Sequence, residues 1–394
     1  MPGKMTNTIS KMLCGIGVLL LCTSCWDRVE INDTAIVVAT AIDVAPDNQV
    51  RMSVQVPLAG QLGGATGGGG GSAGSGSSYY VDSAIAPTLR AATAKLQKRM
   101  SRQLFYAHRR VFIISEAIAE KGIHFYFDAL ARVPENRLSA YVVISKGPAY
   151  ELINAQPRLE RFPAESIREI TKSFGMKPMT LKNASVIMSQ KGMDLTIPYM
   201  EVKENEIGIE TSREINHLGY AQFKDERMVG TFTGEAEQGL LWLQSDIFPP
   251  GGTVKISKKA AITYNVNHAE LSMDIQLEDS KPRISIRVDA DLGILESQTN
   301  TDLLKEETMN RFKTLIRQQI EDQIDAALKL MQAQRADNIG IGNAFGRKYP
   351  QLWLDRYQDE WSDVFGDLDI QVTVHPTITR IGLIEENIIG EGGI

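Results

Sequence analysis

The chain has 394 residues, of which 43% are hydrophobic and 23% are charged, and its formal net charge is -6. These values are typical of a globular protein of two or three domains, and they exclude a disordered or fibrous chain. The acidic balance argues against nucleic acid as a main partner and against a broad electrostatic hold on anionic lipid headgroups, because both need a basic surface.

The first residues follow the order of a secretory signal. Lys4 and Lys11 are the charged residues before position 25, the apolar run MLCGIGVLLL covers Met12–Leu21, and small residues follow at 23 and 24. The run is shorter than the roughly 20 residues that span a bilayer, so a cleaved signal is favoured over a retained transmembrane helix. We therefore predict a lipoprotein signal peptide over residues 1–24.

Cysteine occurs at Cys14, Cys22 and Cys25 and nowhere later, so the body can hold no disulfide and no thiolate metal site. Cys25 follows two small residues, which predicts lipid attachment to Cys25 as the first residue of the mature chain. A diacylglyceryl group supplies the two acyl chains that stable anchoring needs. Lipidation of Cys22 would place bulky Leu21 at the cleavage point and is disfavoured. An ordinary secreted protein, in which Cys25 is incidental, is the remaining alternative.

Strands and helices interleave in the first half of the mature chain. The β-rich runs Thr34–Asp43 and Gln49–Pro57 predict two strands joined by a turn. A helix is expected from Asp82 or Ser83, either of which can cap it, to about Met100.

The next elements complete a predicted N-terminal α+β domain over residues 25–200. Arg109–Ser115 and Ser139–Ser145 are apolar enough to be buried strands, and a helix is expected over Phe125–Arg132 between them. The short spacings favour a mixed sheet. Residues 60–78 are almost wholly Gly, Ser and Ala, so we expect them to form a flexible loop inside this domain.

From about residue 215 the pattern changes to strands with one apolar face. Leu218–Lys224 and Met228–Thr233 flank a polar turn and predict a hairpin. Three further runs alternate polar and apolar residues with period two, which indicates an antiparallel sheet with one wet face. These runs are Lys255–Val266, Leu271–Leu277 and Ile284–Val288.

The longest helix signal covers Thr301 to about Gln334, where apolar residues recur at helical spacing and form one stripe. This helix is expected to pack on the sheet, and a coiled-coil partner helix is the alternative. Gly346–Asp363 predicts further helix and Leu368–Val374 a last strand. We predict a C-terminal α+β region over residues 201–390, which can divide into 201–250 and 251–390.

The predicted fold class is thus α+β and multidomain. Mixed and antiparallel sheets are each packed with helices, and the C-terminal domain holds a long amphipathic helix.

Catalytic and metal-binding patterns are weak throughout. The five histidines (His108, His124, His217, His268 and His375) are scattered, with no ligand spacing. Gly70–Gly74 matches G-x-S-x-G but lies in low-complexity sequence instead of a strand-to-helix turn. Gly340, Gly342 and Gly346 resemble a nucleotide-binding loop, but they follow a helix and the third glycine is one residue late. We therefore predict no enzymatic activity, no cofactor and no metal site.

Two stretches resemble the C subunit of spore germinant receptors, the GerC lipoprotein family. The first runs from the lipidated cysteine through Trp-Asp-Arg, a Glu and an Asn-Asp pair into the first strand, over Cys25–Asp43. The second begins with Gly219–Asp225 and Met228–Gly230. It continues through Glu235, Gly239–Trp242, Asp337, Gly340, Gly342, Arg347–Pro350 and Trp353. Two features depart from the family pattern: the long glycine-rich stretch, and the position three residues before Cys25, which holds Cys22 instead of the usual Leu.

The resemblance implies a non-enzymatic lipoprotein on the outer face of the spore inner membrane, in complex with membrane-embedded A and B subunits. Nutrients would act on this complex to start germination. Trp26, Asp27 and Arg28, next to the lipid, are the candidate membrane or partner contacts, and docking of this segment on its own domain is the alternative. A solute-binding lipoprotein of a transporter is the alternative function, which needs two similar lobes around a cleft. Whether the chain binds a small-molecule germinant itself does not follow from the resemblance.

Overall fold

The computed structural model describes most of the chain after residue 30. The described residues are 31–58, 78–133, 135–173, 175–205, 212–244, 251–258, 260–279, 281–299 and 305–380. The predicted signal peptide, Cys25–Arg28 and nearly all of the glycine-rich stretch lie outside them.

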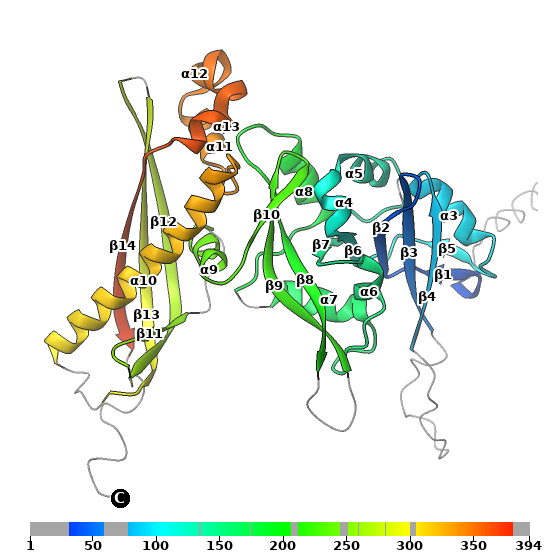
Figure 1. The fold of residues 1–394 in the computed structure, drawn as a ribbon, viewed down its shortest axis with the longest axis horizontal. Helices are drawn as coiled ribbons and strands as arrows, with labels where there is room; N and C mark the ends of the chain where they lie inside the picture. The colour runs from blue at the N-terminus through cyan, green and yellow to red at the C-terminus, as the bar shows by residue number, and fades with distance from the viewer. Residues whose placement is uncertain are drawn as a thin grey trace, which may run out of the picture.

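An eight-stranded mixed sheet forms the first part of the molecule, in the order β10-β9-β8-β7-β6-β2-β3-β4 (Figure 1). Its centre, β2-β6-β7-β8, is parallel, and antiparallel strands extend it at both edges. The strands are β2 (Ala39–Ala45), β3 (Gln49–Pro57), β4 (Tyr79–Ala86), β6 (Val111–Ser115), β7 (Tyr141–Ser145), β8 (Thr196–Asn205), β9 (Ser212–Lys224) and β10 (Arg227–Phe232).

Helices cover both faces of this sheet, as parallel strands require. One face packs against α3 (Leu89–Gln97), α4 (Glu116–Lys121), α5 (His124–Ala131) and α8 (Leu181–Met188). The other face packs against α6 (Ala149–Ile153) and α7 (Pro163–Lys172). Every residue of β6 is buried, which explains why Val111–Ser115 is an unbroken apolar run.

The helix predicted from Asp82 or Ser83 to Met100 is partly wrong. Tyr79–Ala86 is strand β4, paired antiparallel with β3, and α3 begins only at Leu89. The Thr88 side chain caps α3 by accepting a hydrogen bond from the backbone N–H of Ala91, at 3.2 Å. A small two-stranded parallel sheet, β1 (Thr34–Ile36) with β5 (Gln103–Phe105), lies beside α3, and a 3-10 helix at Ile31–Asp33 leads into it.

The second sheet has four strands in the order β11-β12-β13-β14. They are β11 (Gly252–Lys255), β12 (Ala261–Glu278), β13 (Lys281–Ser297) and β14 (Ile370–Arg380). The first three are antiparallel, which confirms the predicted type of sheet, but the predicted runs Lys255–Val266 and Leu271–Leu277 fall largely in the single strand β12. Strand β14 lies parallel to β13. A parallel pair needs a long crossover connection, and the helical segment between β13 and β14 supplies it.

The 28-residue helix α10 (Glu306–Ala333) packs on this sheet together with α9 (Glu235–Trp242), which confirms the predicted long amphipathic helix (Figure 1). Short helices follow: α11 (Ile341–Lys348), α12 (Pro350–Leu352), a π-helix at Trp353–Tyr357 and α13 (Gln358–Gly366). Their aromatic side chains contact one another around Phe345, whose ring lies 5.7 Å from that of Trp361.

The architecture confirms the predicted α+β class, with sheets packed by helices. The eight-stranded sheet runs on through β9 and β10 to Phe232, past residue 200. The division of the chain at residue 200, and the further division near 250, stay predictions.

Candidate functional site

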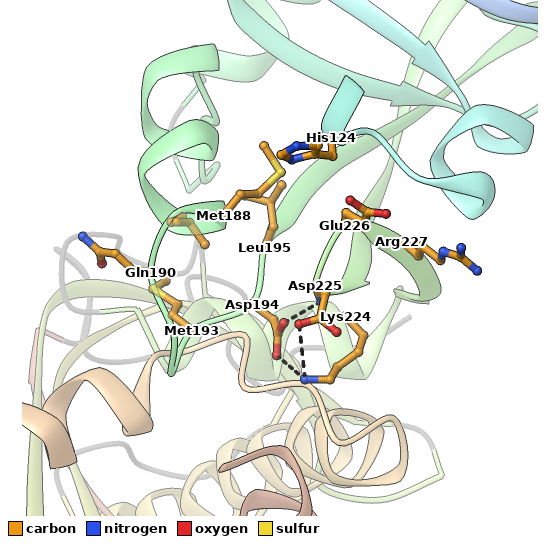
Figure 2. Close-up of a pocket in the computed structure, with 11 residues that line it drawn as sticks. His124, Met188, Gln190, Met193, Asp194, Leu195, Lys224, Asp225, Glu226 and Arg227 are labelled. Carbon is orange, nitrogen blue, oxygen red and sulfur yellow. Dashed lines mark hydrogen bonds and ion pairs between the residues drawn. The ribbon is translucent and has the colours of Figure 1, made fainter. Parts of the chain in front are cut away.

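A pocket of about 340 Å³ lies where the eight-stranded sheet meets the C-terminal helices (Figure 2). Its walls come from the start of α5 (His124), the end of α8 (Met188), the loop before β8 (Met193–Leu195) and the β9–β10 turn (Lys224–Arg227). Asp194, Lys224 and Asp225 point toward one another on one wall, and His124 lies near Met188 on the other. The pocket thus combines thioether and aliphatic surface with a charged hairpin turn.

Asp194 connects the pocket to the C-terminal region. Its carboxylate accepts hydrogen bonds from the backbone N–H groups of Asp225 at 2.8 Å and Asp337 at 2.9 Å. Burial raises the pKa of Asp194, and the Lys224 ammonium, with Nζ 3.5 Å from Oδ2, opposes that rise. Because Lys224 also donates to Ser362 Oγ, the hairpin turn is bound to α13 as well.

Asp337 is the most buried carboxylate of this region, 1% exposed. It accepts hydrogen bonds from the backbone N–H groups of Gly340, Ile341 and Gly342 at 2.7–3.0 Å and from Trp361 Nε1 at 2.9 Å. Burial raises the pKa of Asp337 to about 6, although these four donors favour the ionised form. The Asp337 side chain therefore takes up the backbone N–H groups at the start of α11, the position at which a helix N-terminus favours a bound anion.

The next residue, Asn338, is fully buried and completes the connection. Its Nδ2 donates to the carbonyl oxygens of Leu195 at 3.0 Å and Phe223 at 3.1 Å, and its Oδ1 accepts from Gln222 Nε2 at 2.9 Å. The Asn338 side chain thereby satisfies hydrogen-bonding groups on β9 and on the segment before β8.

Glycines bring the two parts of the chain into direct backbone contact. A Cβ on Gly342 would lie 2.7 Å from the Cα of Gly192 and 2.5 Å from Trp361 Nε1. Gly192 has a φ of +92°, which also favours glycine. We call this set of contacts (Gly192, Asp194, Asp337, Asn338, Gly342) the polar joint.

The polar groups of the joint form hydrogen bonds mainly to one another, an arrangement that holds backbone segments in place.

In the described part of the chain, no three His, Cys, Asp or Glu side chains come together as they would to hold a metal ion. Within the same part, no helix is long and apolar enough to cross a bilayer. The predicted site residues, Cys25 with Trp26, Asp27 and Arg28, lie outside the described residues.

Comparison with known proteins gives two matches that together cover most of the chain. Residues 27–202 match the family described as "Spore germination protein N-terminal domain", and residues 218–382 match "Spore germination B3/ GerAC like, C-terminal". The chain belongs to the GerAC family of spore germination proteins.

Individual relatives match over nearly their whole length. "Putative spore germination protein YfkR" of Bacillus subtilis (strain 168) is 32% identical over 98% of this chain and 100% of its own. "Spore germination protein KC" of the same organism is 25% identical over 94% of this chain and 96% of its own. The crystal structure of the GerBC protein shares the fold, with a TM-score of 0.56 and 17% identity over 86% of this chain and 97% of its own.

The match confirms the predicted family, and the GerAC family of spore germination proteins is not one of enzymes. Several residues on which the resemblance depends meet at the polar joint: Gln222, Lys224, Asp225, Asp337, Gly340 and Gly342. Sequence reasoning missed Gly192, Asp194 and Trp361, because their partners Gly342 and Asp337 are between 24 and 150 residues away in the chain.

Proposed function

We propose that this chain is the lipid-anchored C subunit of a nutrient germinant receptor. A diacylglyceryl group on Cys25 attaches it to the outer face of the spore inner membrane, where it contacts the membrane-embedded A and B subunits. One observation carries the proposal: Cys25 is the last cysteine of the chain, follows an export signal, and begins the Cys-Trp-Asp-Arg start that resembles the family. Membership of a family of spore germination proteins supports it.

Protein contacts are the proposed mode of action, and no reaction is needed. Trp26 suits the interface between headgroups and water, where tryptophan is favoured, and Asp27 and Arg28 can pair with charged groups of a partner. Packing of these three residues on their own domain remains the alternative.

A solute-binding lipoprotein needs two similar lobes that close on a cleft. Here the first part is an eight-stranded mixed sheet with helices on both faces, and the second is a four-stranded sheet that packs on α10. This difference in construction favours the receptor subunit.

The test compares Cys25→Ala with Cys22→Ala in the full chain, expressed in spores that lack the native gene. Cys25→Ala should lose incorporation of labelled palmitate and weaken germination with a subset of nutrients, whereas Cys22→Ala should keep the label at the wild-type level. Germination triggered by dipicolinate should be unchanged in both strains, because it bypasses the receptor.

Retention of label in Cys25→Ala would refute the anchor assignment. A normal nutrient response in the strain that lacks the gene, with no paralogue to compensate, would refute the receptor role.

A further inference from the structure

Positive charge is concentrated in one stretch of this acidic chain. Between Ala84 and Ser115 there are seven Lys and Arg residues and no Asp or Glu. The stretch forms the end of β4, α3, β5 and β6. Arg109 is buried, and the other six are exposed: Arg90, Lys95, Lys98, Arg99, Arg102 and Arg110.

Three of the exposed cations have no partner among the residues that the structure describes. Within the described residues, the side chains of Arg90, Lys98 and Arg102 form no ion pair or hydrogen bond, so nothing there neutralises them. By contrast, Arg99 pairs with Asp82 at 2.9 Å and Arg110 pairs with Glu165. We call the surface formed by Arg90, Lys98 and Arg102 the basic face.

The helix geometry explains why the basic face points outward. Helix α3 buries Leu89, Ala92 and Leu96 against the sheet. Arg90 and Lys98 are eight residues apart, with exposed Ala94 halfway between them, so all three lie on the opposite side of the helix. Arg102 follows in the exposed turn before β5.

The basic face lies at the end of the molecule where the chain enters the fold. Strand β5 is paired with β1, with Gln103 opposite Thr34 and Phe105 opposite Ile36. Ile31 begins the described chain only six residues after Cys25, so any path between them spans at most about 22 Å. In Figure 1, α3, β1 and β5 lie together at one end, and α10 with β14 lies at the other.

We infer that the basic face docks on anionic phospholipid headgroups and orients the anchored protein, with the C-terminal sheet held away from the membrane. The inference rests on the proposed anchor at Cys25, which places this end within reach of the bilayer. Lysine and arginine near an anionic bilayer are attracted over about a Debye length, ~8–10 Å in physiological salt. Phe105, 37% exposed on β5, adds apolar surface at the same end, whereas exposed Asp33 opposes the attraction.

Charge on the rest of the chain makes this orientation selective. The residues from Cys25 onward hold 40 basic and 48 acidic side chains, because both cations of the signal peptide precede Cys25 and no acid does. Other surfaces of the anchored protein are therefore repelled on average by anionic lipid. A local cationic surface on an acidic body acts as an orienting device even though it cannot hold the whole protein at the membrane.

The test measures headgroup contact in the full, lipidated chain. Ala94→Cys provides a single labelling site, because the body has no thiol after Cys25. A fluorophore at position 94 is quenched by nitroxide-headgroup lipids in vesicles of phosphatidylcholine with phosphatidylglycerol or of phosphatidylcholine alone. We expect quenching in the anionic vesicles and little in the neutral ones. Ser285→Cys, exposed on the distal sheet, should show little in either.

Charge variants then test the cause. Each cation near the bilayer raises the ratio of docked to undocked protein about fivefold. The triple variant Arg90→Gln, Lys98→Gln and Arg102→Gln should therefore lower this ratio by roughly 100-fold. The matched control removes three exposed lysines of the C-terminal region, Lys255→Gln, Lys258→Gln and Lys281→Gln, and should leave quenching unchanged.

Other outcomes would overturn the inference. Equal quenching in neutral and anionic vesicles would assign the orientation to the anchor alone. No quenching in either, in protein that sediments with vesicles, would show that the basic face does not contact lipid headgroups. Failure to sediment with neutral vesicles would instead refute the anchor at Cys25, so the two proposals fail in different ways.

Discussion

The two sheets of this molecule bury their strands differently. In the eight-stranded sheet, β6 lies between helix layers and all of its residues are buried. In the four-stranded sheet, buried and exposed residues alternate along most of β13, because its inner side chains pack under α10 while the outer ones face water. The first arrangement produces an unbroken apolar run and the second a period of two.

This difference decides which substitutions destabilise the protein. A two-faced strand, which is buried on both sides of the sheet, has no tolerant position, because successive residues enter separate cores. A one-faced strand, which is buried on one side only, tolerates change at every second residue. Substitutions within the sheets test this contrast directly, and substitutions at the polar joint test how the two sheets are connected.

The largest effects are expected in the two-faced sheet. Ile113→Ala and Ile114→Ala empty space in opposite cores, and each should lower the free energy of unfolding by about 2–5 kcal/mol. In β13, Ile286→Ala should cost a similar amount, whereas the adjacent Arg287→Ala should cost below about 1 kcal/mol, because Arg287 is exposed and only its surface pair with Asp289 is lost. Urea unfolding followed by circular dichroism measures all four.

Equal losses of unfolding free energy at positions 286 and 287 would contradict burial of β13 on one face only. A tolerated substitution at position 113 or 114 would contradict burial of β6 on both faces. Tryptophan fluorescence adds regional information, because Trp242, Trp353 and Trp361 all belong to the C-terminal core.

The same contrast shows how far the sequence alone could lead. The unbroken and alternating patterns predicted strands of both sheets, and apolar residues at helical spacing predicted the long helix α10. They failed over Tyr79–Ala86, where spaced apolar residues suggested a helix but β3 offered a partner strand, and Thr88, not Asp82 or Ser83, caps the helix. They also divided β12 in two, because the register shifts between Val266 and His268 and interrupts the alternation.

The joint was far less accessible to sequence reasoning. Gly340 and Gly342 suggested a nucleotide loop that was rejected on spacing, and the structure supplies the physical reason for the glycines: Asp337 takes the three backbone N–H groups, and Gly192 needs the space beside Gly342. Asp194 carried no local signal at all, because its partner Asp337 is 143 residues away.

An intermediate effect is expected at the joint. Asp337→Asn keeps the shape of the side chain but turns an amide NH₂ toward N–H donors, and it should lower the free energy of unfolding by about 3 kcal/mol. We also expect it to weaken the connection between the sheets, so that the circular dichroism and tryptophan transitions in urea separate. Coincident transitions at an unchanged midpoint would show that Asp337 does not hold the joint together.

The pH dependence of this pair has a defined sign. Because burial raises the pKa of Asp337 from 3.8 to about 6, its contribution to stability is fully present below about pH 3.8 and is lost as the pH rises through about 6. The stability advantage of the wild type over Asp337→Asn should therefore shrink between pH 4 and pH 7, by at most about 3 kcal/mol. An advantage that grows over this range would show that the four N–H donors outweigh burial.

The smallest effect is expected from an ion pair that bridges the same joint at the surface. Lys191 and Asp359 are in contact, but their side chains are 60% and 81% exposed, so water and salt screen the attraction. Lys191→Ala should cost less than about 1 kcal/mol in urea unfolding, no more than Lys329→Ala, which removes an exposed pair within α10. A loss comparable to that of Asp337→Asn would mean that surface charge, and not the buried carboxylate with its glycine contacts, connects the two sheets.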